Sequence, residues 1–312
     1  MTTPDREGQT FAGPSAWARW ASFVKLPHTV FALPFALTGV VLASRSVMPA
    51  IGQVGWVVLA FTAARFAAMA FNRIVDRDVD AKNPRTRMRE IPSGTLLIGQ
   101  AKASVVLASI VFVFASSMLN PLCGMLSPVA LAWVLFYSYC KRFTRWSHLV
   151  LGLGLGIAPV GGYLAVTGVW SDPVWMLPVL AMAVMTWSGG FDILYALQDV
   201  EFDRANGLFS LPAALGAPRA LNVARVLHVG TVLLLALVGW ATGAGLLYAL
   251  GVAAVALLLA YEHSLVKPDD LSKLDAAFFT MNGVISITFF VCVLLDRVLQ
   301  LPSLAAVLER IA

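Results

Sequence analysis

Apolar stretches of about 20 residues recur along almost the whole chain, separated by short polar breaks. A helix of this length crosses the hydrocarbon core of a bilayer, where every backbone polar group must be satisfied internally. The composition agrees, because 59% of the 312 residues are hydrophobic and only 12% are charged, whereas a soluble domain has about 25% charged residues. The pattern therefore predicts an all-α integral membrane protein that crosses the bilayer several times.

The apolar stretches predict nine membrane-spanning helices packed as one bundle, and an alternative count of eight would merge or drop one of them. The expected spans are 26–44, 51–72, 102–119, 124–140, 148–168, 174–195, 222–241, 244–262 and 276–298. We expect three parts in the chain: an N-terminal segment (1–25), a transmembrane domain (26–300) and a C-terminal tail (301–312).

The basic residues predict how the bundle is oriented. Eighteen of the Lys and Arg residues lie at the N-terminus and in alternate breaks on one side, against three on the other side. Loops rich in Lys and Arg stay in the cytoplasm, so we expect a multi-pass protein of the inner (cytoplasmic) membrane with a cytoplasmic N-terminus. The net charge of +5 does not predict a nucleic-acid partner, because the basic residues lie at helix ends and not on one exposed face.

Two acidic clusters interrupt the apolar pattern, and both are expected on the cytoplasmic side. Asn72, Asp76 and Asp80 follow one another at intervals of four residues, and Asp199 and Asp203 repeat that interval. On a continuing helix, residues four apart lie on one face. Each cluster therefore predicts a stripe of oxygen ligands at the end of a membrane span.

Carboxylates one helical turn apart repel each other, so a compensating cation is expected. Mg²⁺ is favoured over Zn²⁺ because neither cluster contains Cys or His, and Mg²⁺ prefers oxygen ligands and bridges to phosphate. Two such clusters would hold one diphosphate between them. Basic residues around the first cluster could contact its oxygens or lipid head groups: Arg73, Arg77, Lys82, Arg85, Arg87 and Arg89.

A weak internal repeat relates the two clusters. Aligning Asp76 with Asp199 also aligns Asn83 with Asn206, and four expected spans separate the clusters. The two halves would then have the same orientation, as parallel repeats do. The repeat predicts that both clusters face one cavity.

Several stretches together resemble the UbiA superfamily of intramembrane prenyltransferases, in particular its 4-hydroxybenzoate polyprenyltransferase branch. "NRIVDRDVD" is similar to the first Asn-x-x-x-Asp-x-x-x-Asp motif, and "DVEFD" to the second Asp-x-x-x-Asp motif. Four further stretches look like the same branch: "KLPHTVFALPFAL", "NPRTRMREIPSG", "FYSYCKRFT" and "YALQDVEFDRANGLFSLP". The resemblance implies nine transmembrane helices around a central cavity and Mg²⁺-bound polyprenyl diphosphate. It also implies transfer of the prenyl group to an aromatic acceptor in ubiquinone or menaquinone biosynthesis.

The resemblance also assigns residues. The metal ligands would be Asn72, Asp76, Asp80, Asp199 and Asp203. Tyr195 and the Lys141–Arg142 pair also fall on family patterns. From the residues themselves, we expect substrate contacts from Asn72, Arg73 and Lys25 as well as from that pair, and catalytic roles for Asp192 and Arg65 as well as Tyr195. Independently of the family, Arg65 and Asp192 lie in or near the ends of spans, where ionisable groups are costly and face an interior cavity. Lys25 has a second explanation, because it begins the first span and could extend to the membrane interface.

Two other features have structural explanations. The run "LGLGLGIAPVGG" at 151–162 lies in an apolar span with no preceding strand, so it predicts close helix packing and not a dinucleotide site. Structural roles are expected for the dispersed histidines, which are His28, His148, His228 and His263.

The acceptor and one functional alternative stay open at this point. "NR" replaces the Asn-Asp of many 4-hydroxybenzoate enzymes, and the opening "LPHTVFALPFAL" looks closer to relatives that prenylate a futalosine-type menaquinone precursor. A haem- or chlorophyll-modifying transferase is a third choice within the family. From another class, a membrane transporter would explain the repeat, but charges at the bilayer midplane would favour it more than charges at helix ends.

Overall fold

The computed structural model describes residues 15–45, 47–274 and 276–299, and its regular structure over this range is helical throughout. Within it, the long helices are α2 (Leu26–Ala43), α3 (Ile51–Val75), α5 (Ile98–Leu119), α6 (Pro121–Cys140), α7 (Ser147–Thr167), α8 (Met176–Tyr195), α11 (Ala217–Ala241), α12 (Leu246–Leu265) and α13 (Asn282–Leu299). Each corresponds in order to one predicted span. Eight are long and apolar enough to cross a membrane, and the described apolar part of α2, Ala32–Ala43, is shorter. The all-α fold is therefore confirmed.

Two helix starts differ from the prediction by more than four residues, for local reasons. α11 begins at Ala217, five residues before the predicted start, because Pro218 in the first turn favours helix initiation there. α13 begins at Asn282 and not at 276, because a π-helical turn, Ala276–Met281, precedes it. A hydrophobic pattern does not distinguish this backbone geometry from an α-helix.

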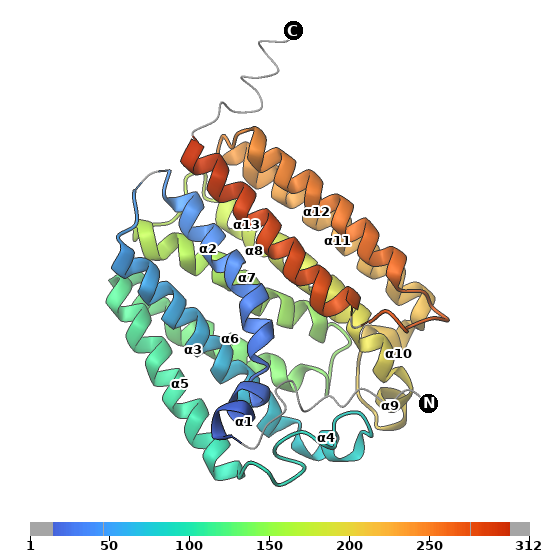
Figure 1. The fold of residues 1–312 in the computed structure, drawn as a ribbon. Helices are drawn as coiled ribbons and strands as arrows, with labels where there is room; N and C mark the ends of the chain where they lie inside the picture. Colours follow the sequence, from blue (N-terminus) through green and yellow to red (C-terminus); the bar gives the residue numbers. More distant parts are fainter. Residues whose placement is uncertain (1–14, 46, 275, 300–312) are drawn as a thin grey trace.

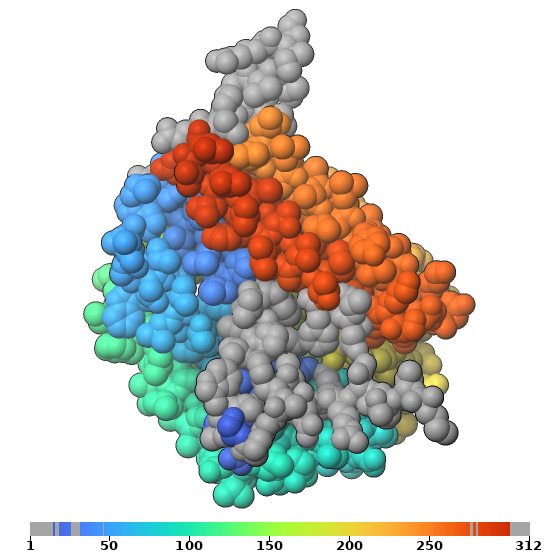
Figure 2. Space-filling model, in the orientation of Figure 1, coloured from blue at the N-terminus to red at the C-terminus, as the bar shows by residue number. Residues whose placement is uncertain are grey.

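The long helices form a closed ring in which neighbours in sequence pack side by side. α13 completes the ring by packing against α2, although these helices lie at opposite ends of the chain (Figure 1). α2 also crosses to pack against α7. In the space-filling view, the red and orange surface of α13 and α12 forms a continuous ridge beside the blue surface of α2 and α3 (Figure 2).

The predicted close packing of the glycine-rich run is confirmed. A side chain at Gly156 would collide with the backbone of Ala181 on α8, and one at Gly162 would collide with Ala36 on α2. α7 therefore needs glycine on two faces to lie between its neighbours. Many large apolar side chains point outwards, as on a lipid-facing surface, and they include Leu107, Ile110, Phe114, Val226 and Leu257.

The two ends of the bundle differ in structure. At one end lie the short helices α1 (Ala16–Phe23), α4 (Arg77–Lys82), α9 (Val200–Ala205) and α10 (Leu211–Leu215), and both acidic clusters are found there (Figure 1). At the other end, Asp296 on α13 accepts hydrogen bonds from the Arg45 guanidinium (2.7 Å) and from the backbone N–H of Gly245 (2.9 Å). This buried carboxylate joins the loop after α2 to the start of α12.

Candidate active site

A cavity of about 440 Å³ lies within the bundle and reaches the end that carries the acidic clusters. All five predicted metal ligands line it. Asn72 lies in the last turn of α3 and Asp76 just after it, Asp80 lies on α4, Asp199 ends the short 3₁₀-helix Ala196–Asp199 that follows α8, and Asp203 lies on α9. The remaining walls of the cavity are largely apolar and include Val57, Phe61, Phe112, Leu119, Leu126, Val134, Leu155 and Val160. One end of the cavity is therefore charged, and the rest of its wall is largely apolar.

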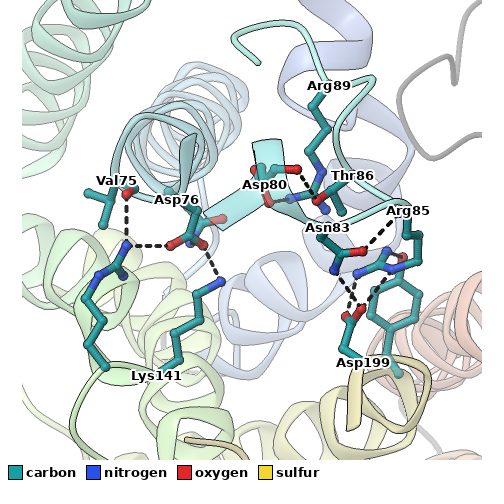
Figure 3. Close-up of polar contacts among 12 residues, drawn as sticks. Val75, Asp76, Asp80, Asn83, Arg85, Thr86, Arg89, Lys141 and Asp199 are labelled. Atoms are coloured by element: carbon teal, nitrogen blue, oxygen red, sulfur yellow. Dashed lines mark hydrogen bonds and ion pairs between the residues drawn. The ribbon is translucent and has the colours of Figure 1, made fainter. Parts of the chain in front are cut away.

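Asp76 is the C-cap residue that follows α3, and it is buried, with 2% of its surface exposed. Lys141 Nζ lies 2.7 Å from Oδ2, and an Arg142 guanidinium nitrogen lies 3.1 Å from Oδ1 (Figure 3). Asn72 Nδ2 also donates to Oδ2 at 3.1 Å. Two cations from the end of α6 thus compensate the first carboxylate of the cluster.

Asp80 lies on α4 and is 4% exposed. Arg89 donates to its Oδ1 at 2.8 Å (Figure 3), whereas Oδ2 has no hydrogen-bond partner among the residues that the structure describes. A buried polar atom without a partner costs about 1–3 kcal/mol or more. Oδ2 is therefore a ligand atom with unused capacity beside the cavity.

Asp199 receives its partners from the loop that follows the first cluster. Asn83 Nδ2 donates to Oδ1 at 3.1 Å, and Arg85 donates through Nε to Oδ1 at 3.1 Å and through a terminal nitrogen to Oδ2 at 2.5 Å (Figure 3). This two-bond geometry gives strong, directional recognition of a carboxylate by arginine. Residues separated by more than 100 positions in sequence therefore meet, and the two clusters face one space.

Tyr195, the last residue of α8, lies beside Asp199 in the same space. Its hydroxyl accepts a hydrogen bond from Arg85 at 3.3 Å. Its ring lies 5.6 Å from Lys25 Nζ and 5.5 Å from the Arg85 guanidinium carbon, and it packs 4.2 Å from the ring of Phe278. Such cation–π contacts position both basic groups at the cavity wall.

The remaining acidic residues have separate partners. Asp203 accepts a hydrogen bond from Ser210 Oγ at 2.8 Å. Asp192, on α8, lies with its Oδ2 2.6 Å from Nδ1 of His148 at the start of α7. Tyr137 on α6 also lines the cavity and is close enough to Arg65, Asp76 and Asp192 to interact with them electrostatically.

Eleven of the twelve predicted site residues line the cavity: Lys25, Arg65, Asn72, Arg73, Asp76, Asp80, Lys141, Asp192, Tyr195, Asp199 and Asp203. Arg142 is not among the lining residues and reaches the site only through Asp76. Asp78 and Glu201, which fall off the predicted stripes, are exposed. The prediction that both clusters face one cavity is confirmed by this geometry.

One detail of the predicted geometry is wrong. The first cluster does not lie on one continuing helix, because α3 ends at Val75 and α4 begins at Arg77, with Asp76 as a turn between them. The two asparagines that the repeat aligns differ in their contacts, because Asn206 donates to the backbone of Phe202 and is exposed. Asn83 instead bridges to Asp199, so the two asparagines have different roles.

Sequence reasoning missed Tyr137 and the polar contact of His148. Tyr137 precedes Lys141 by four residues on α6, so a search for polar residues on the same helix face would have found it. No spacing signal leads to His148, because Asp192 lies 44 residues away. The side chain of His28 lies outside the residues whose side chains the structure describes.

The donor atoms at the charged end fit Mg²⁺. Within residues 15–45, 47–274 and 276–299, no three His, Cys, Asp or Glu side chains gather closely enough to hold a metal by themselves. Mg²⁺ does not require such a group, since it binds through one or two carboxylates, water and phosphate oxygens. The unpartnered Oδ2 of Asp80 and the all-oxygen character of both clusters suit an ion held between protein and phosphate.

Comparison with known proteins gives consistent matches. A model of the UbiA prenyltransferase family matches residues 32–284. A 4-hydroxybenzoate octaprenyltransferase of Sodalis glossinidius is 30% identical over 285 residues, which cover 90% of this chain and 96% of the relative. One from Aromatoleum aromaticum is 28% identical over 289 residues, covering 91% and 88% of the two chains.

Solved structures show the same fold. The apo structure of a UbiA homologue from Aeropyrum pernix K1 superposes with a TM-score of 0.79 at 31% identity, covering 86% of this chain and 98% of that one. A UbiA homologue from Archaeoglobus fulgidus bound to DMAPP and Mg²⁺ has a TM-score of 0.70 at 19% identity, covering 90% and 99%. The charged cavity, the multi-pass helical fold and these matches lead to one conclusion: the chain is a multi-pass integral membrane protein that belongs to the UbiA prenyltransferase family.

Proposed function

We propose that this protein transfers a polyprenyl group from a polyprenyl diphosphate to an aromatic acceptor of the 4-hydroxybenzoate class. The observation that carries the proposal is the bridge from Asn83 and Arg85 to Asp199, which brings both acidic clusters to one cavity. A diphosphate bound there would have its isoprenoid chain beside the apolar walls of the same cavity.

Mg²⁺ would be held by Asn72, Asp76, Asp80, Asp199 and Asp203. When bound, it would neutralise the negative charge that develops on the leaving diphosphate. Lys141, Arg85 and Arg89 are paired with these carboxylates at 2.5–2.8 Å. With diphosphate present, the same basic groups are placed to donate to its oxygens, which have a similar charge and geometry.

The reaction then needs one bond broken and one formed. The C1–O bond of the allylic diphosphate breaks, and its electron pair leaves with the diphosphate. A ring carbon of the acceptor donates an electron pair to C1. The proton on that ring carbon then passes to the released diphosphate, which restores aromaticity. The apolar walls exclude water that would otherwise react with the developing carbocation.

The acceptor would bind between the diphosphate end and the buried polar groups of α3 and α8. Arg65 has a buried Nε without a hydrogen-bond partner among the described residues, and it is suited to an acceptor carboxylate. Asp192 is suited to the acceptor hydroxyl, and Lys25 is a second candidate for the carboxylate. The octaprenyltransferase relatives support a 4-hydroxybenzoate acceptor, and the opening "LPHTVFALPFAL" favours a futalosine-type acceptor as the second candidate.

The excess of basic residues at the end that carries the clusters supports the proposal that this end faces the cytoplasm. The family match lies within the proposed transmembrane domain, 26–300. The segment 1–25 and the tail 301–312 fall mostly outside the described residues, so these boundaries remain a prediction.

The test supplies purified protein in sealed liposomes with Mg²⁺, a labelled polyprenyl diphosphate and each acceptor in turn. We expect label in a prenylated aromatic product, with the acceptor identified by product mass. Label that crosses sealed membranes without any aromatic product would refute the transferase proposal and support the transporter alternative.

A further inference from the structure

Groups from two other helices, α8 and α10, contact the imidazole of His148 on α7. The ring is buried at 4% exposure at the start of α7 and lines the cavity. Its Nδ1 lies 2.6 Å from Asp192 Oδ2 on α8, and its Nε2 accepts a hydrogen bond of 3.3 Å from the backbone N–H of Leu211 on α10. The sequence alone indicated only a structural role for this histidine.

These two neighbours determine where the proton of the neutral ring lies. The Leu211 N–H can only donate, so Nε2 must present its lone pair. Nδ1 then carries the hydrogen and donates it to the Asp192 carboxylate. One oxygen of Asp192, Oδ2, is thereby fixed, and the Asp192 side chain is 25% exposed where it lines the cavity. Asp192 therefore keeps one acceptor atom for a ligand in the cavity.

The same contact reaches the second acidic cluster. Ser210, which precedes Leu211, donates through Oγ to Asp203 at 2.8 Å and caps α10 by accepting from the Ala213 N–H at 3.3 Å. A single turn of chain thus contacts both Asp203 and His148. This turn fixes Asp192 relative to the cluster that would face the diphosphate.

We propose that His148 is a positioning residue for prenyl transfer. This proposal rests on the function proposed above. Its hydrogen bond holds the Asp192 carboxylate at a fixed position relative to the diphosphate end of the cavity. From that position, Asp192 accepts a hydrogen bond from the hydroxyl of the aromatic substrate. A phenol that donates to a carboxylate has a more electron-rich ring, so this orientation favours attack on C1 of the prenyl donor.

Three substitutions separate positioning from packing. His148→Asn keeps an N–H donor near the position of Nδ1, His148→Gln keeps a polar group near Nε2 for the Leu211 contact, and His148→Leu keeps neither. His263→Asn serves as the matched control, because His263 lies on α12 and does not line the cavity. Thermal unfolding in detergent identifies any variant that does not fold.

We expect His148→Leu and His148→Gln to lower kcat/KM for the aromatic acceptor by about 10- to 100-fold, the effect of losing a hydrogen bond to a charged group. The KM for the polyprenyl diphosphate should stay within about threefold of wild type, and His148→Asn should recover most of the activity. A merely structural role predicts the opposite order, because the glutamine variant keeps the contact with α10.

The inference is overturned if the kcat/KM of His148→Gln for the aromatic acceptor equals or exceeds that of His148→Asn. It is overturned equally if the variants mainly raise the KM for the polyprenyl diphosphate. It is also overturned if all three variants match His263→Asn. If the wild-type protein forms no prenylated aromatic product, the proposed function itself is refuted. If the wild-type protein is active and the His148 variants are equally active, only the role of His148 is refuted.

Discussion

Asp199→Asn tests whether the second cluster acts in catalysis or only in folding. Asp199 accepts three hydrogen bonds, one from Asn83 and two from Arg85. An amide offers one oxygen acceptor and no charge, so at least one bond and the ion pair are lost. Hydrogen bonds to charged groups contribute about 1.5–3 kcal/mol each, but the Arg85 and Asp199 side chains are 21% and 18% exposed, which screens the pair.

We therefore expect Asp199→Asn to lower the free energy of unfolding by about 1–2 kcal/mol, a small part of the roughly 5–15 kcal/mol typical of folded proteins. The effect on transfer should be larger. Loss of one group that stabilises charge in the transition state lowers kcat by about 10²- to 10³-fold. The variant should insert and purify normally while its turnover is nearly abolished.

The assay measures prenyl transfer and thermal unfolding on the same purified samples. Asp78→Asn is the matched control, since Asp78 is only two residues from Asp76 and its side chain is 81% exposed. Asp76→Asn should resemble Asp199→Asn. The two-cluster mechanism is refuted if both variants turn over substrate at the rate of the Asp78 control.

Three further predictions follow from the same structure. Asp296→Asn should lower the free energy of unfolding by about 1–3 kcal/mol, because it weakens the buried contact with Arg45, and kcat measured on the folded fraction should be unchanged; a lower kcat would place this end of the bundle in the catalytic cycle. Gly162→Ala should lower the free energy of unfolding by about 1–3 kcal/mol, because the added methyl group would collide with the backbone of Ala36. Gly161→Ala, whose methyl group would meet open space beside the cavity, should be tolerated in a thermal unfolding assay. Equal losses of stability in the two variants would contradict this packing. Removal of Mg²⁺ with a chelator should abolish transfer, and added Mg²⁺ should restore it, since the oxygen ligands at both clusters suit this ion; full activity in chelator would rule out the metal proposal.

The sequence predicts the fold well because the thickness of the bilayer determines the length of every helix that spans it. All nine spans have a counterpart, and errors are confined to helix starts such as Asn282, where a π-helical turn has the same apolar composition as an α-helix. The sequence also predicts which residues line the cavity. Intervals of four residues identify Asp76 and Asp199, and ionisable residues inside spans identify Arg65.

Contacts between distant residues could not be predicted in the same way. The bridge from Arg85 to Asp199 depends on the path of the loop after α4, and the spacing of residues along the sequence does not predict that path. The pairing of His148 with Asp192 depends on the packing of α7 against α8, which its glycines allow but do not specify. The weak repeat aligns Asn206 with Asn83, but an alignment carries no information on which asparagine contacts the second cluster.

The most direct test of the account is a structure determined with Mg²⁺ and a non-hydrolysable polyprenyl diphosphate. We predict a single diphosphate in the cavity, with Mg²⁺ at roughly 2.0–2.1 Å from carboxylate oxygens of both clusters. The isoprenoid chain should lie along the apolar walls formed by α3, α5, α6 and α7. A diphosphate that contacts only one cluster, or that binds outside this cavity, would contradict the central claim.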